Sequence, residues 1–256
     1  VLEINQLDLG KLNISSVKGL EYFKNLWSLE LDSNNITDIS PLQGLDNLVV
    51  LDISGNKITD ISPIVNLKNL EDLDASNNKI SKLPDDLSGL VNLYHLNLAN
   101  NEITDISPLG TLKSDIESLF LQNNNIADIS ALSHLDTLKV LYLGGNKALT
   151  DYSPVIPYYL SLEDRDFHLP AVENVSISGS NKVGSVLTGS YKYVNPNGHP
   201  EKGTTFRWLR SETYDGEYTP IEGAVSTTYK LTGSDADKYI KFEVTPGADG
   251  VPSKGV

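Results

Sequence analysis

Apolar positions along the first two-thirds of the chain recur with a period of about 22 residues. One unit carries Leu26, Leu29 and Leu31, followed by Asn34 and a further apolar position at Ile36. The same spacing returns from Ile4, Leu26, Leu48, Leu70, Leu93, Ile116 and Leu138. Two units are one residue longer, around residues 84–86 and 113–115. A fixed period of this length predicts stacked units, since no single unit can bury its apolar face alone.

Each unit divides into a short strand and a return segment. Leu29 and Leu31 alternate with polar neighbours, as expected of a strand with one buried face. The return segment Thr-Asp-Ile-Ser-Pro-Leu at residues 37–42 contains a proline, which suits a turn or 3₁₀ segment better than a long helix. The pattern predicts a solenoid of about seven repeats, with a concave parallel β-sheet and short 3₁₀ or turn returns.

An asparagine follows each predicted strand except the first, where Leu12 replaces it. A buried carboxamide both donates and accepts, so it can satisfy backbone groups of adjacent coils. We expect a structural ladder formed by Asn34, Asn56, Asn78, Asn101, Asn124 and Asn146.

The side chains between the buried leucines are predicted to line the concave face, which runs from an acidic half to an aromatic end. The candidate binding residues are Asp8, Trp27, Glu30, Asp32, Asp52, Asp72, Asp74, Tyr94, His95, Asn97, Phe120 and Tyr142. Aromatic side chains are favoured anchors at interfaces. For Phe120 and Tyr142 the alternative is that the following cap or domain covers them.

A different periodicity begins near residue 170, where short alternating stretches are separated by turn signals such as Asp215-Gly216. Phe206 and Trp208 share one strand face, as do Phe242 and Val244. This pattern predicts about seven strands in a β-sandwich. We therefore expect a repeat domain with its C-terminal cap over residues 1–168 and an immunoglobulin-like sandwich over residues 169–256.

Charge is concentrated in the repeats, with a net of −13 through Leu169 and −1 in the remainder. An acidic surface argues against nucleic acid as a partner and leaves open a preference for a basic one. No stretch has the roughly 18 apolar residues of a membrane helix. The absence of methionine suggests a processed or trimmed segment, and the absence of cysteine favours a bacterial surface protein or a cytosolic scaffold.

No catalytic motif emerges from the sequence. The four histidines are scattered without metal-ligand spacing, and no nucleophile elbow, phosphate loop or zinc-protease motif is present. The carboxylate pairs Asp72/Asp74 and Glu30/Asp32 resemble those of hydrolases, but an open sheet offers no cleft that would exclude water. We expect no catalytic residues, no metal site and no cofactor.

The 22-residue period, the Ile-Thr-Asp-Ile-Ser-Pro-Leu return segment and the asparagine ladder resemble those of the internalin family of bacterial surface proteins. The C-terminal stretch, through residues 205–210, 226–229 and 237–246, is similar to immunoglobulin-like modules of large bacterial surface proteins. The resemblance implies an extracellular protein, either secreted or at the bacterial surface. It also implies that the concave face binds another macromolecule.

Two functions follow from these observations. The first is a non-enzymatic adhesion or binding protein whose partner is a host receptor, another surface protein or a glycan. The second is a structural or targeting module of a larger enzyme associated with the cell wall. A cytosolic scaffold is disfavoured by the immunoglobulin-like module.

Overall fold

The computed structural model describes residues 4–195, 198, 200–248 and 251–252. The chain divides into two compact units, Val1–Phe167 and His168–Val256. Within the described residues, no helix combines the length and apolar character needed to cross a membrane.

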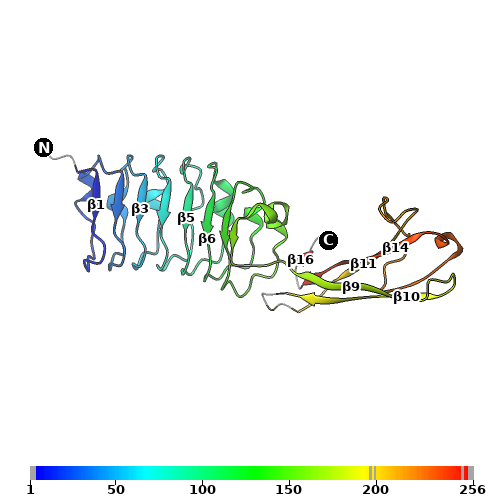
Figure 1. Ribbon diagram of the computed structural model, residues 1–256. Helices are drawn as coiled ribbons and strands as arrows, with labels where there is room; N and C mark the ends of the chain where they lie inside the picture. The colour runs from blue at the N-terminus through cyan, green and yellow to red at the C-terminus, as the bar shows by residue number, and fades with distance from the viewer. Residues whose placement is uncertain (1–3, 196–197, 199, 249–250, 253–256) are drawn as a thin grey trace. The chain divides into compact units, whose positions relative to one another are not determined.

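The first unit is a solenoid whose strands form one parallel sheet (Figure 1). Its eight strands are β1 (Gln6–Asp8), β2 (Ser28–Glu30), β3 (Val50–Asp52), β4 (Asp72–Asp74), β5 (His95–Asn97), β6 (Ser118–Phe120), β7 (Val140–Tyr142) and β8 (Asp164–Arg165). The middle residue of each strand from β2 to β7, such as Leu29 or Leu51, is buried. The predicted solenoid is confirmed, with one strand more than the seven repeats suggest.

The additional strand, β8, lies in the segment that the sequence suggested was only a closing cap. The N–H groups of Glu163 and Asp164 donate to the Lys139 carbonyl oxygen over 2.7 and 3.1 Å. Beyond β8, the Asp166 carboxylate accepts hydrogen bonds from the N–H groups of Leu143 (2.6 Å) and Gly144 (2.9 Å). Leu162 and Phe167 beside β8 are buried, but Arg165 occupies the place of the central leucine and lies 24 residues after Leu141, which is why the period does not reveal this strand.

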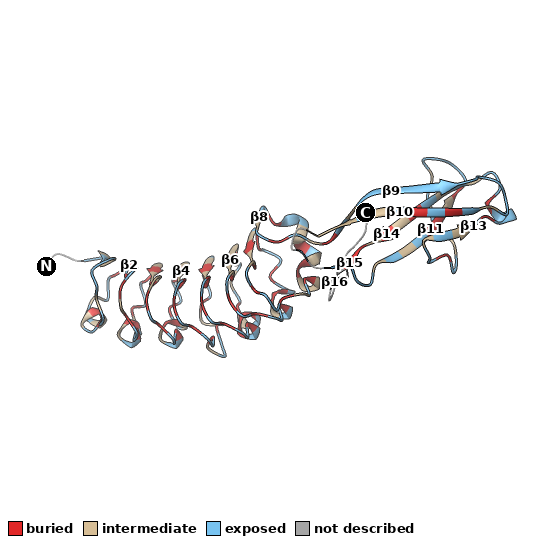
Figure 2. Cartoon of the chain, turned by 90° about the horizontal axis from the view of Figure 1, so that it is seen from below, coloured by how far each residue is buried: buried red, intermediate tan, exposed pale blue. Residues whose placement is uncertain are grey.

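Most return segments contain a 3₁₀ turn, and four of these six turns carry the proline that predicts them. They are η1 (Leu20–Tyr22), η2 (Ser40–Leu42), η3 (Ser62–Ile64), η4 (Ser107–Thr111), η5 (Ser130–Leu132) and η6 (Ser153–Ser161). An aspartate two residues before the first turn residue fixes several of them, as where the Asp38 carboxylate accepts from the Ser40 N–H over 2.8 Å. Figure 2 shows the strands and the turns on opposite sides of the unit, with buried residues between them.

The expected asparagines form a continuous buried ladder along the first unit. Asn78 is typical: its Oδ1 accepts from the Ile58 N–H over 2.9 Å, and its Nδ2 donates to the carbonyl oxygens of Ile53, Ala75 and Ser76. All six asparagines are at most 8% exposed. At the N-terminal end Asn34 accepts from the Leu12 N–H over 3.2 Å, while the Leu12 side chain stays exposed.

The second unit contains two three-stranded antiparallel sheets and a hairpin. Its strands are β9 (Ala171–Gly179), β10 (Val186–Val194), β11 (Thr205–Ser211), β12 (Thr219–Pro220), β13 (Thr228–Lys230), β14 (Tyr239–Thr245), β15 (Gly247–Ala248) and β16 (Val251–Pro252). The sheets run in the orders β13-β10-β9 and β12-β11-β14. As the alternation predicts, Trp208, Phe242 and Val244 are buried between them, with Phe206 packed against this cluster.

A buried aspartate organises the turn before β14. Asp235, at the end of the 3₁₀ turn η7 (Gly233–Asp235), accepts hydrogen bonds from Tyr229 Oη (2.7 Å), Thr232 Oγ1 (2.7 Å) and the Thr232 N–H (2.8 Å). Burial opposes its ionisation, yet these bonds and that from Arg210 lower the pKa of the Asp235 carboxyl. The Tyr229 hydroxyl thus ties β13 to the turn that precedes β14.

Candidate binding surface

Two rows of side chains cover the solvent side of the eight-stranded sheet, which we call the strand face. The strand register aligns a central row of Asp8, Glu30, Asp52, Asp74, Asn97, Phe120 and Tyr142. Beside it runs a leading row of Gln6, Ser28, Val50, Asp72, His95, Ser118, Val140 and Asp164. Because neighbouring strands lie about 4.8 Å apart, adjacent members of a row can contact the same ligand group.

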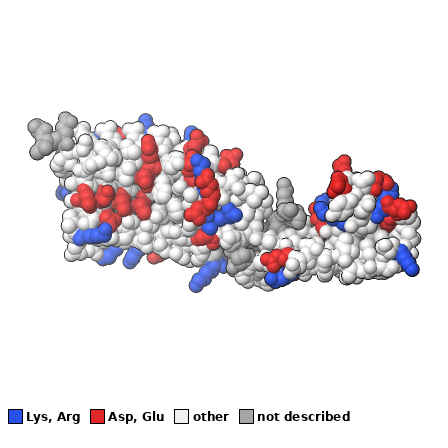
Figure 3. Space-filling model, viewed as in Figure 1, with Lys and Arg blue, Asp and Glu red and all other residues white. Residues whose placement is uncertain are grey.

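The N-terminal half of the central row places four carboxylates on consecutive strands: Asp8, Glu30, Asp52 and Asp74. Among the described residues, none of the four takes part in an ion pair. Figure 3 shows acidic side chains gathered over the N-terminal strands. This half of the strand face is therefore a row of four carboxylates, none of which forms an ion pair with another described residue.

Hydrogen bonds hold several of these carboxylates in fixed positions. Asp8, Asp52 and Asp74 each accept from the N–H group two residues later, over 2.8 to 2.9 Å. The second oxygen of Asp74 accepts from Asn97 Nδ2 over 2.9 Å. Burial raises the pKa of the Asp52 carboxyl, and the charges of Asp74 and Asp32 raise it further, although hydrogen bonds from Ser54 oppose this.

Asp32 differs from the other acidic candidates because it lies beyond the end of β2. Its side chain is only 17% exposed, and its carboxylate pairs with Lys11 Nζ at 3.3 Å. The structure thus places Asp32 at the margin of the strand face with a cation already beside it. It contributes charge near Asp52 and is less available than Glu30 to a partner.

The C-terminal end of the strand face carries a row of three rings. The His95 and Phe120 centroids lie 5.2 Å apart, and those of Phe120 and Tyr142 lie 5.1 Å apart. Tyr142 Oη donates to Asp164 Oδ2 over 2.8 Å, so β8 engages the last ring. None of the three rings is fully buried, and they form a continuous half-exposed platform.

The residues just before the strands form a flank row, which includes Trp27 and Tyr94. These two side chains are 40% and 50% exposed. Tyr94 Oη and Lys139 Nζ both donate to Glu117 Oε2 over 2.6 Å. The bond to Lys139 and then that to Tyr94 lower the pKa of the Glu117 carboxyl. Sequence reasoning singled out Tyr94 but missed Lys139, whose role depends on contacts between three repeats.

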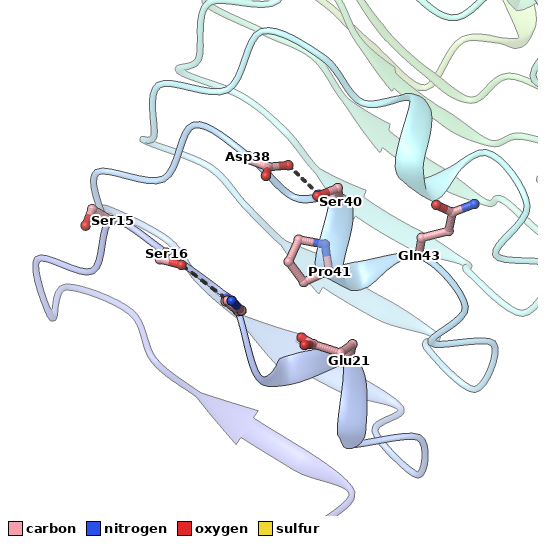
Figure 4. A pocket seen from close by; sticks show the side chains of 8 residues that line it. Ser15, Ser16, Glu21, Asp38, Ser40, Pro41 and Gln43 are labelled. Carbon is pink, nitrogen blue, oxygen red and sulfur yellow. Dashed lines mark hydrogen bonds between the residues drawn. The ribbon is translucent and has the colours of Figure 1, made fainter.

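A hollow of about 570 Å³ lies on the return side of the first two repeats and not on the strand face (Figure 4). Its carboxylates already serve the local fold: Glu21 accepts from the Gly19 N–H over 2.6 Å and Asp38 from the Ser40 N–H. Hydrogen bonds from Ser40 lower the pKa of the Asp38 carboxyl. The described residues contain no cluster that could hold a metal ion.

Comparison with known proteins identifies the repeats. Residues 24–66, 68–111 and 115–157 match the family described as "Leucine Rich repeats (2 copies)", which accounts for just over half of the chain. The chain belongs to the leucine-rich-repeat family. Residues 171–253 of this leucine-rich-repeat protein match the family described as "AIR9 A9 domain", in agreement with the immunoglobulin-like C-terminal domain.

Several solved structures resemble this leucine-rich-repeat protein. An internalin, InlF, of Listeria monocytogenes is 33% identical with a TM-score of 0.60, over 65% of this chain and 48% of that one. Internalin C2 of the same organism is 30% identical with a TM-score of 0.53, over 64% and 81%. A leucine-rich-repeat protein of Leptospira interrogans is 25% identical with a TM-score of 0.50, over 63% and 48%. No curated protein matches the sequence.

These matches confirm the resemblance to internalins. The chain spans about half the length of the InlF structure that it matches. The leucine-rich-repeat protein has an internalin-like fold, of a kind that typically binds other proteins through its repeats.

Proposed function

We propose that this chain is a non-enzymatic binding protein that acts outside the cell, at a bacterial surface or in secreted form. Its strand face binds a protein partner through a basic segment of that partner. The observation that carries this proposal is the row of Asp8, Glu30, Asp52 and Asp74, on consecutive strands and without an ion pair among the described residues.

Repulsion between the carboxylates of the acidic half favours the binding of a cation there. Like charges on adjacent strands repel one another. Burial raises the pKa of the Asp52 carboxyl, and the nearby charges of Asp74 and Asp32 raise it further. A lysine or arginine from a partner would relieve that repulsion. Three strand spacings separate Asp8 from Asp74, about 14 Å, a length that four or five residues of an extended peptide cover.

The aromatic end supports the same proposal. Phe120 lies between His95 and Tyr142 and is partly exposed. Rings held rigidly on a strand lose little entropy on binding and pack well against apolar or guanidinium groups. We expect this end to anchor the partner while the acidic half selects it. A glycan partner would instead use mainly the rings.

A charge-reversal variant tests the proposal. Glu30→Lys, Asp52→Lys and Asp74→Lys, made together, should abolish binding of a lysine-rich peptide that the wild-type chain retains. The matched control reverses three exposed acidic residues away from the strand face: Asp46→Lys, Glu102→Lys and Asp115→Lys. Both variants change the net charge equally, so the control separates the strand face from overall charge.

The peptide is followed by calorimetry or by fluorescence anisotropy, and thermal unfolding checks that both variants fold. Retention of the peptide by the strand-face variant would overturn the proposal, as would equal loss in both variants. Phe120→Ala, screened with the wild type on a glycan array, then distinguishes a sugar partner from a protein partner.

A further inference from the structure

The strand β9 of the immunoglobulin-like unit is exposed along almost its whole length (Figure 2). Val175 and Ile177 are 41% and 39% exposed, although both belong to a strand of a sandwich. Neither takes part in the core cluster around Trp208. Opposite Ile177 stands Gly189, where the Phe242 ring occupies the space a side chain would need. The core is therefore filled without Val175 and Ile177.

The backbone of β9 also has an open side. In β10, the Gly189 N–H donates to the Thr227 carbonyl oxygen, towards β13. Because backbone groups alternate in direction along a strand, Thr188 and Ser190 face β9 and pair with Ser178 and Ser176. The same alternation turns the N–H and C=O groups of Val175 and Ile177 away from β10. No described strand pairs with that side, since β9 is the last strand of its sheet.

The other edges of the two three-stranded sheets are protected. Strand β12 has two residues, one of them Pro220, and β13 has only three. Strand β14 carries Lys241 and Glu243. Short length, proline and charge are the usual means by which proteins prevent edge pairing. In β9 a bulge at Asn174 and the charge of Glu173 protect only the first part, so residues 175–179 lack such protection.

We propose that β9 is a self-association site at which two copies of this chain pair their strands in antiparallel fashion. The strand register that pairs the outward N–H and C=O groups of Val175 and Ile177 is centred on Ser176. It places Val175 opposite Ile177 of the second copy, with the outward N–H and C=O groups of both residues in hydrogen-bonding register. Directly opposite residues share a face of the sheet, so the apolar side chains of the two copies cover one another.

Charge favours a second copy through this unit. The net charge is −13 through Leu169 and −1 in the rest of the chain, so contact between repeats would be repulsive and contact between the second units is not. In the register centred on Ser176, Glu173 faces Gly179 of the second copy and no like charges oppose one another. A pairing of about five residues buries less than a standard interface, so the dimer is weak and depends on concentration.

Cysteine cross-linking of the 256-residue chain tests both the site and its register, because this sequence has no cysteine. In Ser176→Cys the two thiols stand directly opposite one another, at a separation that a disulfide can bridge. Ser178→Cys is the matched control: it lies on the same strand and face and is also exposed, but its two copies stand about 14 Å apart. Mild oxidation should link most of the first variant and little of the second.

A charge on the edge should prevent the association. Adding Val175→Lys to Ser176→Cys is expected to reduce cross-linking at least tenfold, whereas adding Val183→Lys, another exposed valine of this unit, leaves it unchanged. Sedimentation of the wild-type chain should show dimer growing with concentration. Equal cross-linking of the two cysteines would refute the proposal, and so would a wild-type chain that stays monomeric up to about 1 mM.

Discussion

Throughout the repeats, asparagine and aspartate side chains form hydrogen bonds with backbone groups. Whether such a side chain is buried or exposed determines its role. The ladder asparagines are buried, and each joins adjacent coils through its donor and its acceptor. The aspartates of the return segments are exposed and accept one local N–H each. Those of the strand face do the same with one oxygen, which leaves their charge to the solvent or to a partner.

Loss of a ladder side chain should be costly. Asn78→Ala removes the acceptor of the Ile58 N–H and the donor of three carbonyl oxygens in a buried position. We expect a loss of about 3 kcal/mol, which lowers the Tm by roughly 6–12 °C. The control Asn69→Ala removes one exposed bond to the Asp46 carbonyl oxygen and should cost less than about 1 kcal/mol. Similar effects in calorimetric scans of the two variants would contradict this account.

Neutralising Asp52 should stabilise the protein at neutral pH. Its pKa is raised above the ordinary value of 3.8 in the folded chain, so the folded state holds the proton more tightly than the unfolded state does. Ionised Asp52 therefore reduces stability at high pH, and this penalty disappears as the pH falls through the folded pKa. Asp52→Asn, which keeps an acceptor for the Ser54 N–H, should raise the Tm at pH 7 by about 1–3 °C.

The gain from Asp52→Asn should vanish near pH 3, where the wild-type carboxyl is protonated as well. Asp46→Asn makes the same change at an exposed position on the return side and should alter the Tm little at either pH. A gain that persists at low pH would show that packing and not charge explains the effect.

At the scale of the repeat, units of constant length pack in the same way, and a unit of different length makes contacts that the others do not make. The unit between β4 and β5 is one residue longer than most, and the structure assigns it no 3₁₀ turn. Its chain passes close to the preceding repeat, where a Cβ atom at Gly89 would overlap the Val65 carbonyl oxygen. A small apolar void lies beside it, lined by Val65, Leu83, Leu87 and their neighbours.

Gly89 should tolerate substitution poorly. Gly89→Ala forces the methyl group against a backbone atom and should cost about 1–3 kcal/mol. Gly110→Ala is the control in the following return segment, because the nearest atom to its added Cβ, His134 Cε1, is 3.7 Å away. That substitution should be neutral or slightly stabilising, since alanine restricts the unfolded chain. Chemical denaturation of both variants measures the difference, and equal stability would refute the close approach at Gly89.

At the scale of the whole molecule, the two units differ in charge and therefore suit different contacts. The repeats carry nearly all of the net charge of −14 and the second unit carries almost none. A long acidic surface attracts basic partners from a distance, while a nearly neutral sheet edge permits copies of the same chain to approach. A dimer formed through β9 would hold two strand faces in one assembly and increase the avidity for a repetitive partner.

Association with a basic partner should depend strongly on salt. For the lysine-rich peptide, raising the ionic strength from about 0.05 to 0.3 M should slow association by roughly tenfold or more, because the Debye length falls well below the dimensions of the acidic row. Stopped-flow fluorescence measures this rate. The control variant with Asp46→Lys, Glu102→Lys and Asp115→Lys should keep most of the salt dependence, and the strand-face variant should lose it. A rate independent of salt would exclude electrostatic attraction by the strand face.

The sequence by itself determined the repeat, its register and the two classes of fold. Apolar spacing repeated over many units leaves few ways to bury Leu29, Leu51 and their equivalents, and the same register fixes which side chains share a row. The asparagine ladder follows from the same logic, because a polar residue at a constant buried position needs constant partners.

Only the tertiary structure decided what depends on contacts between segments without a shared pattern. Strand β8, the Tyr94–Glu117–Lys139 contacts and the bond from Tyr142 to Asp164 join different repeats. The open edge of β9 depends on where its sheet ends, and alternation along one strand carries no information about that. A periodic sequence specifies the contacts that recur in every repeat. The end of a sheet, a free edge or a single side-chain contact occurs once, so no periodicity in the sequence predicts it.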